Sequence, residues 1–146
     1  AMLHVENVLD YLRNKTDMEI PRTIIVGDPS LDHALQSRSA IEEIFAKYPE
    51  HSYVYAGTNQ NPPEPYKMPG LYPNRVQTEG KRLKMPFLHL YKTHILDLMF
   101  EYGIDELAKI THSCTEQKVG RCNKCFQCNE RAWAFQQLDK KDEGLV

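Results

Sequence analysis

Residues 114–128 read CTEQKVGRCNKCFQC and contain every cysteine of the 146-residue chain. Cys114, Cys122, Cys125 and Cys128 follow the spacing C-x7-C-x2-C-x2-C. The two-residue gaps place neighbouring sulfur atoms on one side of a tight turn, and the longer gap lets the first cysteine fold back over the others. Four thiolates suit the closed tetrahedral coordination of a structural Zn2+ ion. The spacing therefore predicts a zinc site that holds a small C-terminal lobe together.

Other interpretations of these cysteines remain open. An iron–sulfur cluster also takes four cysteines, but the C-x3-C-P sequence that closes the ferredoxin pattern is missing here. Disulfides form in oxidising compartments, whereas no secretory signal is visible at the N-terminus. His112 lies beside the cysteines, yet four thiolates already complete a tetrahedral site. Zinc is the preferred interpretation, and a cytoplasmic location is expected.

The composition is that of an ordinary globular protein. The formal net charge is -2 at pH 7, and hydrophobic residues make up 41% of the chain. Its length accommodates one domain with a modest core. A near-neutral charge argues against a dedicated binder of duplex DNA, which usually carries a clear basic excess. No apolar run approaches the roughly 20 residues that a membrane span requires.

The N-terminal half alternates helix and strand signals. Apolar residues recur at helical spacing over residues 3–14 and again from Ile41 to Tyr48, which predicts two amphipathic helices. Residues 22–26 and 52–56 are short β-branched or aromatic runs next to proline or glycine, a pattern typical of buried strands. This order of elements favours parallel pairing in an α/β layer.

The C-terminal half begins with a proline-rich stretch. Residues 57–80 are expected to form a long loop, and loops of this length are often functional. A helix that carries Ile95 is predicted to end at Gly103, a suitable residue just beyond a helix C-terminus. A short helix over 105–110 and a final helix from about Asn129 follow.

We therefore expect a single α/β domain over residues 1–138. The zinc segment occupies residues 111–135 of this domain, and residues 139–146 form a flexible charged tail. Trp133 and Phe135 are expected to pack in the core rather than stack against a ligand.

One basic residue is expected to act near the metal. Arg131 lies about one helical turn beyond Cys128. Because a zinc ion held by four thiolates carries net negative charge, the guanidinium is expected to offset that charge from outside the ligand set.

Several motifs of the chain follow one another in a recognisable order. They are Tyr53-Val-Tyr-Ala-Gly57, Tyr72-Pro-Asn-Arg75, Met85-Pro-Phe-Leu88 with Lys92 and Ile95, Tyr102-Gly-Ile104, Thr111-x-Ser-Cys114, and Cys122-x-x-Cys125-x-x-Cys128-x-x-Arg131-x-x-Ala-Phe135. This set resembles the C-terminal half of 7-cyano-7-deazaguanine synthase, the queuosine-pathway member of the PP-loop ATP pyrophosphatase group. The resemblance spans residues 52–136 and is most specific from residue 85 to residue 135.

The resemblance implies a fold and a reaction. The fold is a partial Rossmann-like parallel sheet, of the adenine nucleotide alpha hydrolase type, with a C-terminal four-cysteine zinc segment. The reaction is an ATP-dependent C–N ligation that converts 7-carboxy-7-deazaguanine and ammonia into the nitrile preQ0. ATP adenylates the carboxylate, ammonia displaces AMP to give an amide, and a second activation dehydrates the amide. Mg2+ neutralises the charge that develops on the phosphates.

The resemblance also implies substrate-binding residues. They are Tyr72, Arg75, Lys92, Thr111 and Ser113, each at a position that matches a family motif. Lys92 is expected to face an anionic substrate or phosphate, and the two hydroxyl residues are expected to border the pocket. The catalytic residues are not identified by this resemblance.

One defining motif of the family is absent from the sequence. The chain has no Ser-Gly-Gly-x-Asp-Ser phosphate loop, and the nearest glycine-bearing turn, at residues 27–30, reads as an ordinary turn after a strand. In the Tyr72 motif, Asn74 replaces the Asp-Cys pair of the family. A split or truncated enzyme would need the phosphate loop, with ATP and Mg2+, from a complementing N-terminal polypeptide. A homo-oligomer is the alternative partner that we expect.

A different class of function also fits the missing phosphate loop. The chain would then be a non-catalytic zinc module that recognises a protein, a nucleotide or RNA through its proline-rich and basic loops. Such a module would lose binding when its metal is removed, because the metal contributes to folding. No membrane partner is expected, and nucleic acid is a less favoured partner than a small molecule.

Overall fold

The computed structural model describes residues 2–21, 23–48, 53–63 and 80–144. Five helices and two strands occur in these ranges. In chain order they are α1 (Met2–Lys15), α2 (His33–Lys47), β1 (Val54–Tyr55), β2 (Leu83–Lys84), α3 (Lys92–Glu101), α4 (Glu106–Ile110) and α5 (Phe126–Gln137). Tyr72 and Arg75, two of the predicted substrate-binding residues, lie outside the described residues.

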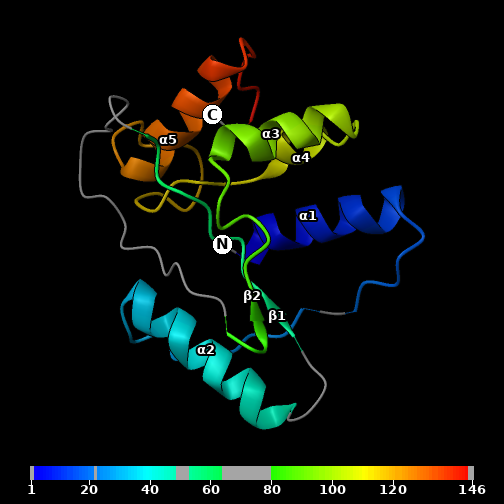
Figure 1. Cartoon of the computed structure of the whole chain (residues 1–146), viewed down its shortest axis with the longest axis vertical. Coiled ribbons are helices and arrows are strands. Elements are labelled where there is room, and N and C mark those ends of the chain that lie inside the picture. Colours follow the sequence, from blue (N-terminus) through cyan, green and yellow to red (C-terminus); the bar gives the residue numbers. More distant parts are fainter. Residues whose placement is uncertain (1, 22, 49–52, 64–79, 145–146) are drawn as a thin grey trace.

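The hydrophobic core lies in the C-terminal part of the chain, where α3, α4 and α5 pack together (Figure 1). Its central residues are Leu96, Ala108, Trp133, Ala134 and Phe135. The rings of Trp133 and Tyr91 meet edge to face at an interplanar angle of 87°, and Phe135 makes the same kind of contact with Phe100. The prediction that Trp133 and Phe135 are core residues is confirmed.

The sheet consists of two short parallel strands. Val54 of β1 pairs with Leu83 of β2, and Tyr55 pairs with Lys84. The strand predicted over residues 52–56 is confirmed at Val54–Tyr55, whereas β2 was not anticipated from the sequence. The architecture is therefore α/β with a small parallel sheet.

The prediction of a buried strand over residues 22–26 is wrong for the described residues 23–26. These residues form no strand, and the side chains of Ile24 and Ile25 are 54% and 76% exposed. β-branched residues favour an extended backbone, but a strand needs a neighbour for its N–H and C=O groups. The described part of the chain provides no strand beside this segment.

The predicted helices are largely confirmed. The helix expected over residues 3–14 is α1, and the helix expected over 105–110 is α4. Gly103 follows the C-cap of α3 with a φ of +63°, a conformation that glycine adopts without strain. The final helix begins at Phe126, earlier than expected, so that Cys128 belongs to its first turn.

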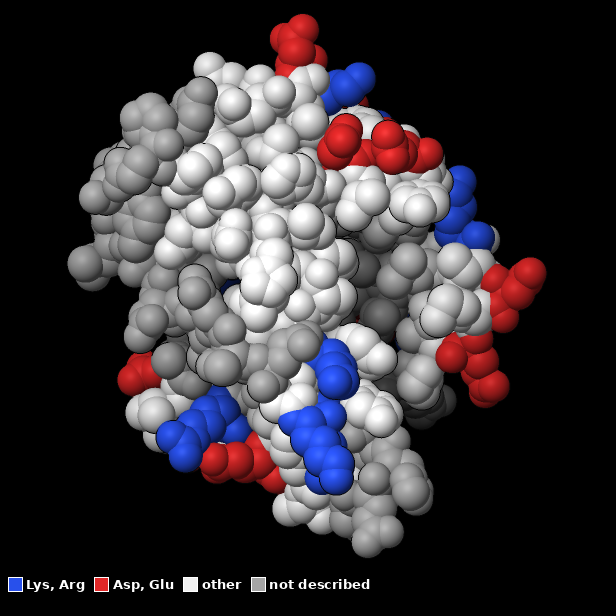
Figure 2. Space-filling model, viewed as in Figure 1, with Lys and Arg blue, Asp and Glu red and all other residues white. Residues whose placement is uncertain are grey.

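The two N-terminal helices lie on different sides of the small sheet (Figure 1). α1 packs against α4. α2 is held near β2 by Arg82, whose guanidinium lies 4.1 Å from the centre of the Phe45 ring and donates to the Tyr48 carbonyl. On the face shown in Figure 2, the described basic side chains fall into small groups rather than one broad basic surface.

Candidate metal centre and adjoining pocket

The four cysteines come together in the structure. Their sulfur atoms all lie within 4.8 Å of one another, and none of the four is in a disulfide. In a tetrahedral site with Zn–S bonds of about 2.3 Å, neighbouring sulfur atoms are about 3.8 Å apart. The sulfur atoms are therefore close enough to ligate one metal ion after small side-chain adjustments. This arrangement shows that Cys114, Cys122, Cys125 and Cys128 form a group that could hold one metal ion.

The turn between Cys122 and Cys125 is built around a sulfur atom. The Cys122 sulfur accepts backbone N–H groups from Lys124 at 3.4 Å and Cys125 at 3.2 Å. Between them, Asn123 has a φ of +56°, a left-handed conformation that asparagine tolerates better than most residues. Contacts within residues 122–125 thus hold the Cys122 sulfur and place Cys125 next to it.

The N-terminus of α5 supplies two further ligands. Cys125 is its N-cap residue and Cys128 lies in its first turn, where the helix dipole favours negative charge. Burial raises the pKa of the Cys125 thiol, but N–H groups of Thr115 and Cys128 outweigh burial and lower this pKa to about 6. Burial and the neighbouring thiols raise the pKa of Cys128 to about 12. The pKa values of these two thiols are thus shifted in opposite directions.

Two histidines hold the loop that joins Cys114 to Cys122. His112 contacts the Gly120 carbonyl through Nε2 at 2.9 Å, and His4 of α1 contacts the Lys118 carbonyl through Nε2 at 3.1 Å. The two imidazole rings stack with centroids 4.5 Å apart. His112 is not part of the group of potential ligands, so its role is to position the loop.

A pocket of about 260 Å3 adjoins the metal centre. Its apolar wall comes from Phe87, Ile95, Leu96 and Met99, and its polar wall comes from Asn59, Lys92, Thr111, Ser113 and Arg131, with Gly57 at the edge. The structure thus brings together the three predicted substrate-binding residues that it describes, namely Lys92, Thr111 and Ser113. Because Ser113 directly precedes Cys114, the metal centre fixes one wall of this pocket.

A buried ion pair lies at the side of the pocket. The Lys92 ammonium is 2.8 Å from a carboxylate oxygen of Glu130, whose side chain is 0% exposed. Asn59 donates to the other carboxylate oxygen at 3.2 Å. A buried carboxylate is tolerated only with such partners. Glu130 and Asn59 were not identified from the sequence.

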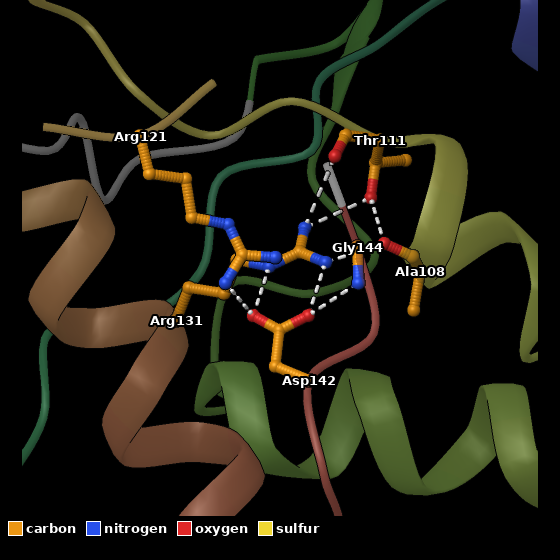
Figure 3. Close-up of polar contacts among 6 residues, drawn as sticks. All are labelled: Ala108, Thr111, Arg121, Arg131, Asp142 and Gly144. Carbon is orange, nitrogen blue, oxygen red and sulfur yellow. Dashed lines mark hydrogen bonds and ion pairs between the residues drawn. The ribbon is translucent and has the colours of Figure 1, made fainter. Parts of the chain in front are cut away.

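The contacts of Arg131 in the structure are with the end of α4 and with Asp142. Its guanidinium donates to the carbonyl groups of Ala108 and Thr111 and to the Thr111 hydroxyl, and it forms an ion pair with Asp142 (Figure 3). The two carbonyl groups lie at the C-terminal end of α4, where a helix has unsatisfied acceptors. Arg131 therefore ties α5 to the segment that leads into Cys114. That its charge offsets the charge of a metal site stays a prediction.

The segment after α5, predicted to be a flexible tail, takes part in this network. Asp142 also forms an ion pair with Arg121 at 2.6 Å, and its side chain is only 11% exposed. The flexibility of residues 139–146 as a whole stays a prediction.

The turn at residues 27–30 has the wrong polarity for a phosphate site. The Gly27 N–H donates to the Glu43 carboxylate at 2.9 Å. The Asp28 carboxylate accepts both the N–H and the hydroxyl of Ser30, which lowers the pKa of Asp28. The contacts of this turn are those of a local turn rather than a phosphate site, but no strand precedes it in the described residues 23–26.

The sequence model for "Queuosine biosynthesis protein QueC" matches residues 40–139, which is most of the chain. The chain belongs to this family. The matched region includes the four cysteines and every residue that lines the pocket, and it excludes Asp142. Comparisons with curated proteins and with solved structures found no match. Each helix in the described ranges is too short or too polar to cross a membrane.

The Asp142 ion pairs predict a contribution to stability that depends on pH. Burial raises the pKa of Asp142, but Arg131, the Gly144 N–H and Arg121 outweigh it and lower this pKa below its ordinary value of 3.8. The contribution is therefore present above pH 3.8 and is lost as the pH falls through the lower pKa of the folded state. Urea unfolding should show Asp142→Asn less stable than wild type at pH 7 and pH 5, with a smaller difference at pH 3. An equal difference at all three values would contradict this assignment.

Proposed function

We propose that this QueC-family chain carries the zinc-binding, substrate-side part of a 7-cyano-7-deazaguanine synthase. In this proposal the pocket beside the metal centre binds 7-carboxy-7-deazaguanine, and the metal is a structural Zn2+ ion. The observation that carries the proposal is the convergence of Lys92, Thr111 and Ser113 on one pocket beside the four cysteines.

The size and polarity of the pocket support a small, flat, anionic ligand. Its volume of about 260 Å3 lies below the range of roughly 300–1,000 Å3 that drug-sized ligands occupy. The apolar side chains of Phe87 and Met99 suit the faces of a heteroaromatic ring. The Lys92 ammonium supplies a positive charge for a carboxylate, and the Ser113 hydroxyl supplies a hydrogen-bonding group.

The four cysteines have the chemistry that zinc requires. Zn2+ accepts four thiolates in a closed tetrahedral site, and such a site supplies folding free energy rather than a reaction step. Cys114 holds the end of the segment that carries Thr111 and Ser113, while Cys128 holds α5. The metal would thus keep two walls of the pocket together. The free thiols also suit the reducing cytoplasm that this proposal assumes.

The ATP chemistry is assigned to a complementing segment that carries a phosphate loop. The sequence contains no phosphate loop, and the turn at residues 27–30 faces carboxylates. The complementing segment would bring the phosphate loop with ATP and Mg2+, and the complete enzyme would have the Rossmann-like sheet of which β1 and β2 form a part. The substrate carboxylate would be activated by ATP, converted to the amide by ammonia, and dehydrated after a second activation.

Turnover provides the first test of the proposal. Zinc-loaded chain is incubated with 7-carboxy-7-deazaguanine, ammonium, ATP and Mg2+, with and without a polypeptide that contains Ser-Gly-Gly-x-Asp-Ser. We expect AMP and the nitrile only in the complemented reaction, both measured by liquid chromatography and mass spectrometry. Absence of AMP with several such polypeptides, together with absence of substrate binding, would refute the proposal.

Ligand selectivity tests the role of the ammonium in the pocket. The double variant Lys92→Gln, Glu130→Gln removes the ion pair while keeping both side chains at similar size. The wild type should bind 7-carboxy-7-deazaguanine about tenfold more tightly than the neutral 7-cyano compound, because a charge-assisted hydrogen bond contributes about 1.5–3 kcal/mol. The double variant should show little preference, as measured by isothermal titration calorimetry.

A surface ion pair provides the matched control. Lys109 and Glu106 lie 2.8 Å apart on α4, with side chains that are 36% and 55% exposed. The variant Lys109→Gln, Glu106→Gln should keep the wild-type preference. If both double variants keep that preference, Lys92 does not recognise the carboxylate.

The non-catalytic alternative has one supporting observation, the absence of a phosphate loop from the sequence. It predicts that the chain binds a protein, nucleotide or RNA partner without any turnover. Nitrile formation in the complemented reaction would exclude this alternative.

A further inference from the structure

The segment that follows α5 places one carboxylate between two arginines (Figure 3). Arg131 contacts both oxygen atoms of Asp142, with Nε at 2.7 Å from one and Nη2 at 2.8 Å from the other. Arg121 Nη1 lies 2.6 Å from a carboxylate oxygen, and the Gly144 N–H donates at 3.1 Å. Two parallel bonds from one guanidinium are the geometry by which arginine recognises carboxylates and phosphates.

The N–H groups around the Asp142 carboxylate outnumber the hydrogen bonds that this carboxylate accepts. Arg121 Nη2 is buried and has no hydrogen-bond partner among the residues that the structure describes. This nitrogen lies against the backbone of Gly144, because a Cβ at that residue would approach it to 2.9 Å. A buried donor without a partner is costly. A tetrahedral anion has more oxygen atoms than a carboxylate, and it could satisfy this remaining donor.

Space and positive charge are present beside the two arginines. A hollow of about 550 Å3 is lined by three basic side chains and two acidic ones, namely Arg121, Lys140, Lys141, Asp139 and Asp142. Grouped cations raise the local concentration of anions. The hollow therefore gives an anion access to the position that Asp142 occupies.

We propose that Arg121 and Arg131 form a binding site for a phosphate group, and that Asp142 fills this site as an internal substitute. Binding of phosphate displaces the segment that carries Asp142. Arg131 also lines the pocket beside the metal centre, so that a phosphate bound here lies next to that pocket. The proposal does not rest on the synthase function and is tested without it.

The variant Asp142→Asn provides the first test. An asparagine keeps the size of the side chain but removes the charge that competes with phosphate. Because an occupied site lowers the apparent affinity by the fraction that is open, the variant should bind inorganic phosphate at least about tenfold more tightly than wild type. Binding is measured by calorimetry at constant ionic strength, after circular dichroism and zinc content show an intact fold.

Two control variants separate the site from general charge effects. Asp97→Asn removes one negative charge at an exposed position of α3 that does not line the hollow, and it should leave phosphate affinity at the wild-type value. Adding Arg121→Met to Asp142→Asn should abolish the gain. A folded Asp142→Asn protein that binds phosphate no better than Asp97→Asn would overturn the proposal.

The source of the phosphate group is distinguished with AMP and adenosine. Tighter binding of AMP than of inorganic phosphate identifies a nucleotide as the ligand, whereas equal affinity identifies free phosphate. Adenosine bound as tightly as AMP would show that the arginines do not recognise phosphate and would overturn the proposal.

The wild-type protein offers a measurement that does not depend on the folding of a variant. Lys140 and Lys141 are trypsin sites next to Asp142. Phosphate should accelerate cleavage there relative to other sites in the chain, while chloride at equal ionic strength should not. Equal rates in phosphate and chloride would contradict displacement of the segment.

Discussion

Replacing Cys128 by serine is expected to weaken metal binding and loosen the packing of α5 on α3. Cys128 is buried and comes from the first turn of α5, so its loss disconnects this helix from Cys114. If the roughly 10–16 kcal/mol of a structural zinc site is shared over four ligands, the variant loses about 3 kcal/mol. Zinc affinity should therefore fall about 100-fold, as measured by competition with a chelating dye. Thermal unfolding should begin at lower temperature.

The matched control for this variant lies in the same loop. Gln117 is exposed between Cys114 and Cys122 and contributes no ligand. Gln117→Ser should bind zinc as wild type does. A chelator should lower the stability of wild type and of Gln117→Ser to that of Cys128→Ser. If Cys128→Ser retained wild-type zinc affinity, the closed four-thiolate site would be wrong.

Replacing Lys92 by methionine is expected to destabilise the protein by about 3–5 kcal/mol, which is the usual result of removing one partner from a buried ion pair. Glu130 is 0% exposed and lies 2.8 Å from the Lys92 ammonium. Without that charge, the carboxylate stays in a poorly solvated place beside the core. Urea unfolding with zinc present measures the difference.

Two further variants distinguish the effect of an unpaired buried charge from the effect of losing the lysine side chain. The double variant Lys92→Met, Glu130→Leu removes both charges and should recover most of the stability, since apolar pairs often replace buried ion pairs at little cost. Lys109→Met removes a lysine that is also 2.8 Å from a carboxylate but lies at the surface, and it should change stability little. Equal destabilisation by Lys92→Met and by the double variant would mean that packing, not charge, explains the loss.

The metal centre was predictable from the sequence because its geometry is local. The C-x2-C-x2-C spacing fits one turn and the start of one helix, so neighbouring sulfur atoms converge without distant contacts. Lys92, Thr111 and Ser113 were found through the order of family motifs, and the structure places them in one pocket. What that pocket binds remains a proposal.

Residues that act through distant contacts were harder to predict. In the sequence, Glu130 resembles an ordinary solvated glutamate in a helix. Only its spacing from the apolar residues of the helix indicates that it is buried. Phe126, Glu130 and Ala134 are spaced four residues apart, and all three are buried on one face of α5. This register was the available signal for Glu130. Its partners, Lys92 and Asn59, lie far from it in the sequence.

The strand expected at residues 22–26 was predicted from β-branched residues, which show only a local preference for an extended backbone. A strand forms only beside another strand. Arg131 was likewise expected to serve the nearest charge in the sequence. Asp142, which follows the end of α5, is its partner in space.

X-ray absorption at the zinc edge of the purified, metal-loaded protein tests the central claim most directly. Our account predicts one zinc ion per chain, with four sulfur neighbours at about 2.3 Å and no nitrogen or oxygen ligand. A purified protein without bound zinc, or a zinc ion with oxygen or nitrogen ligands, would contradict it.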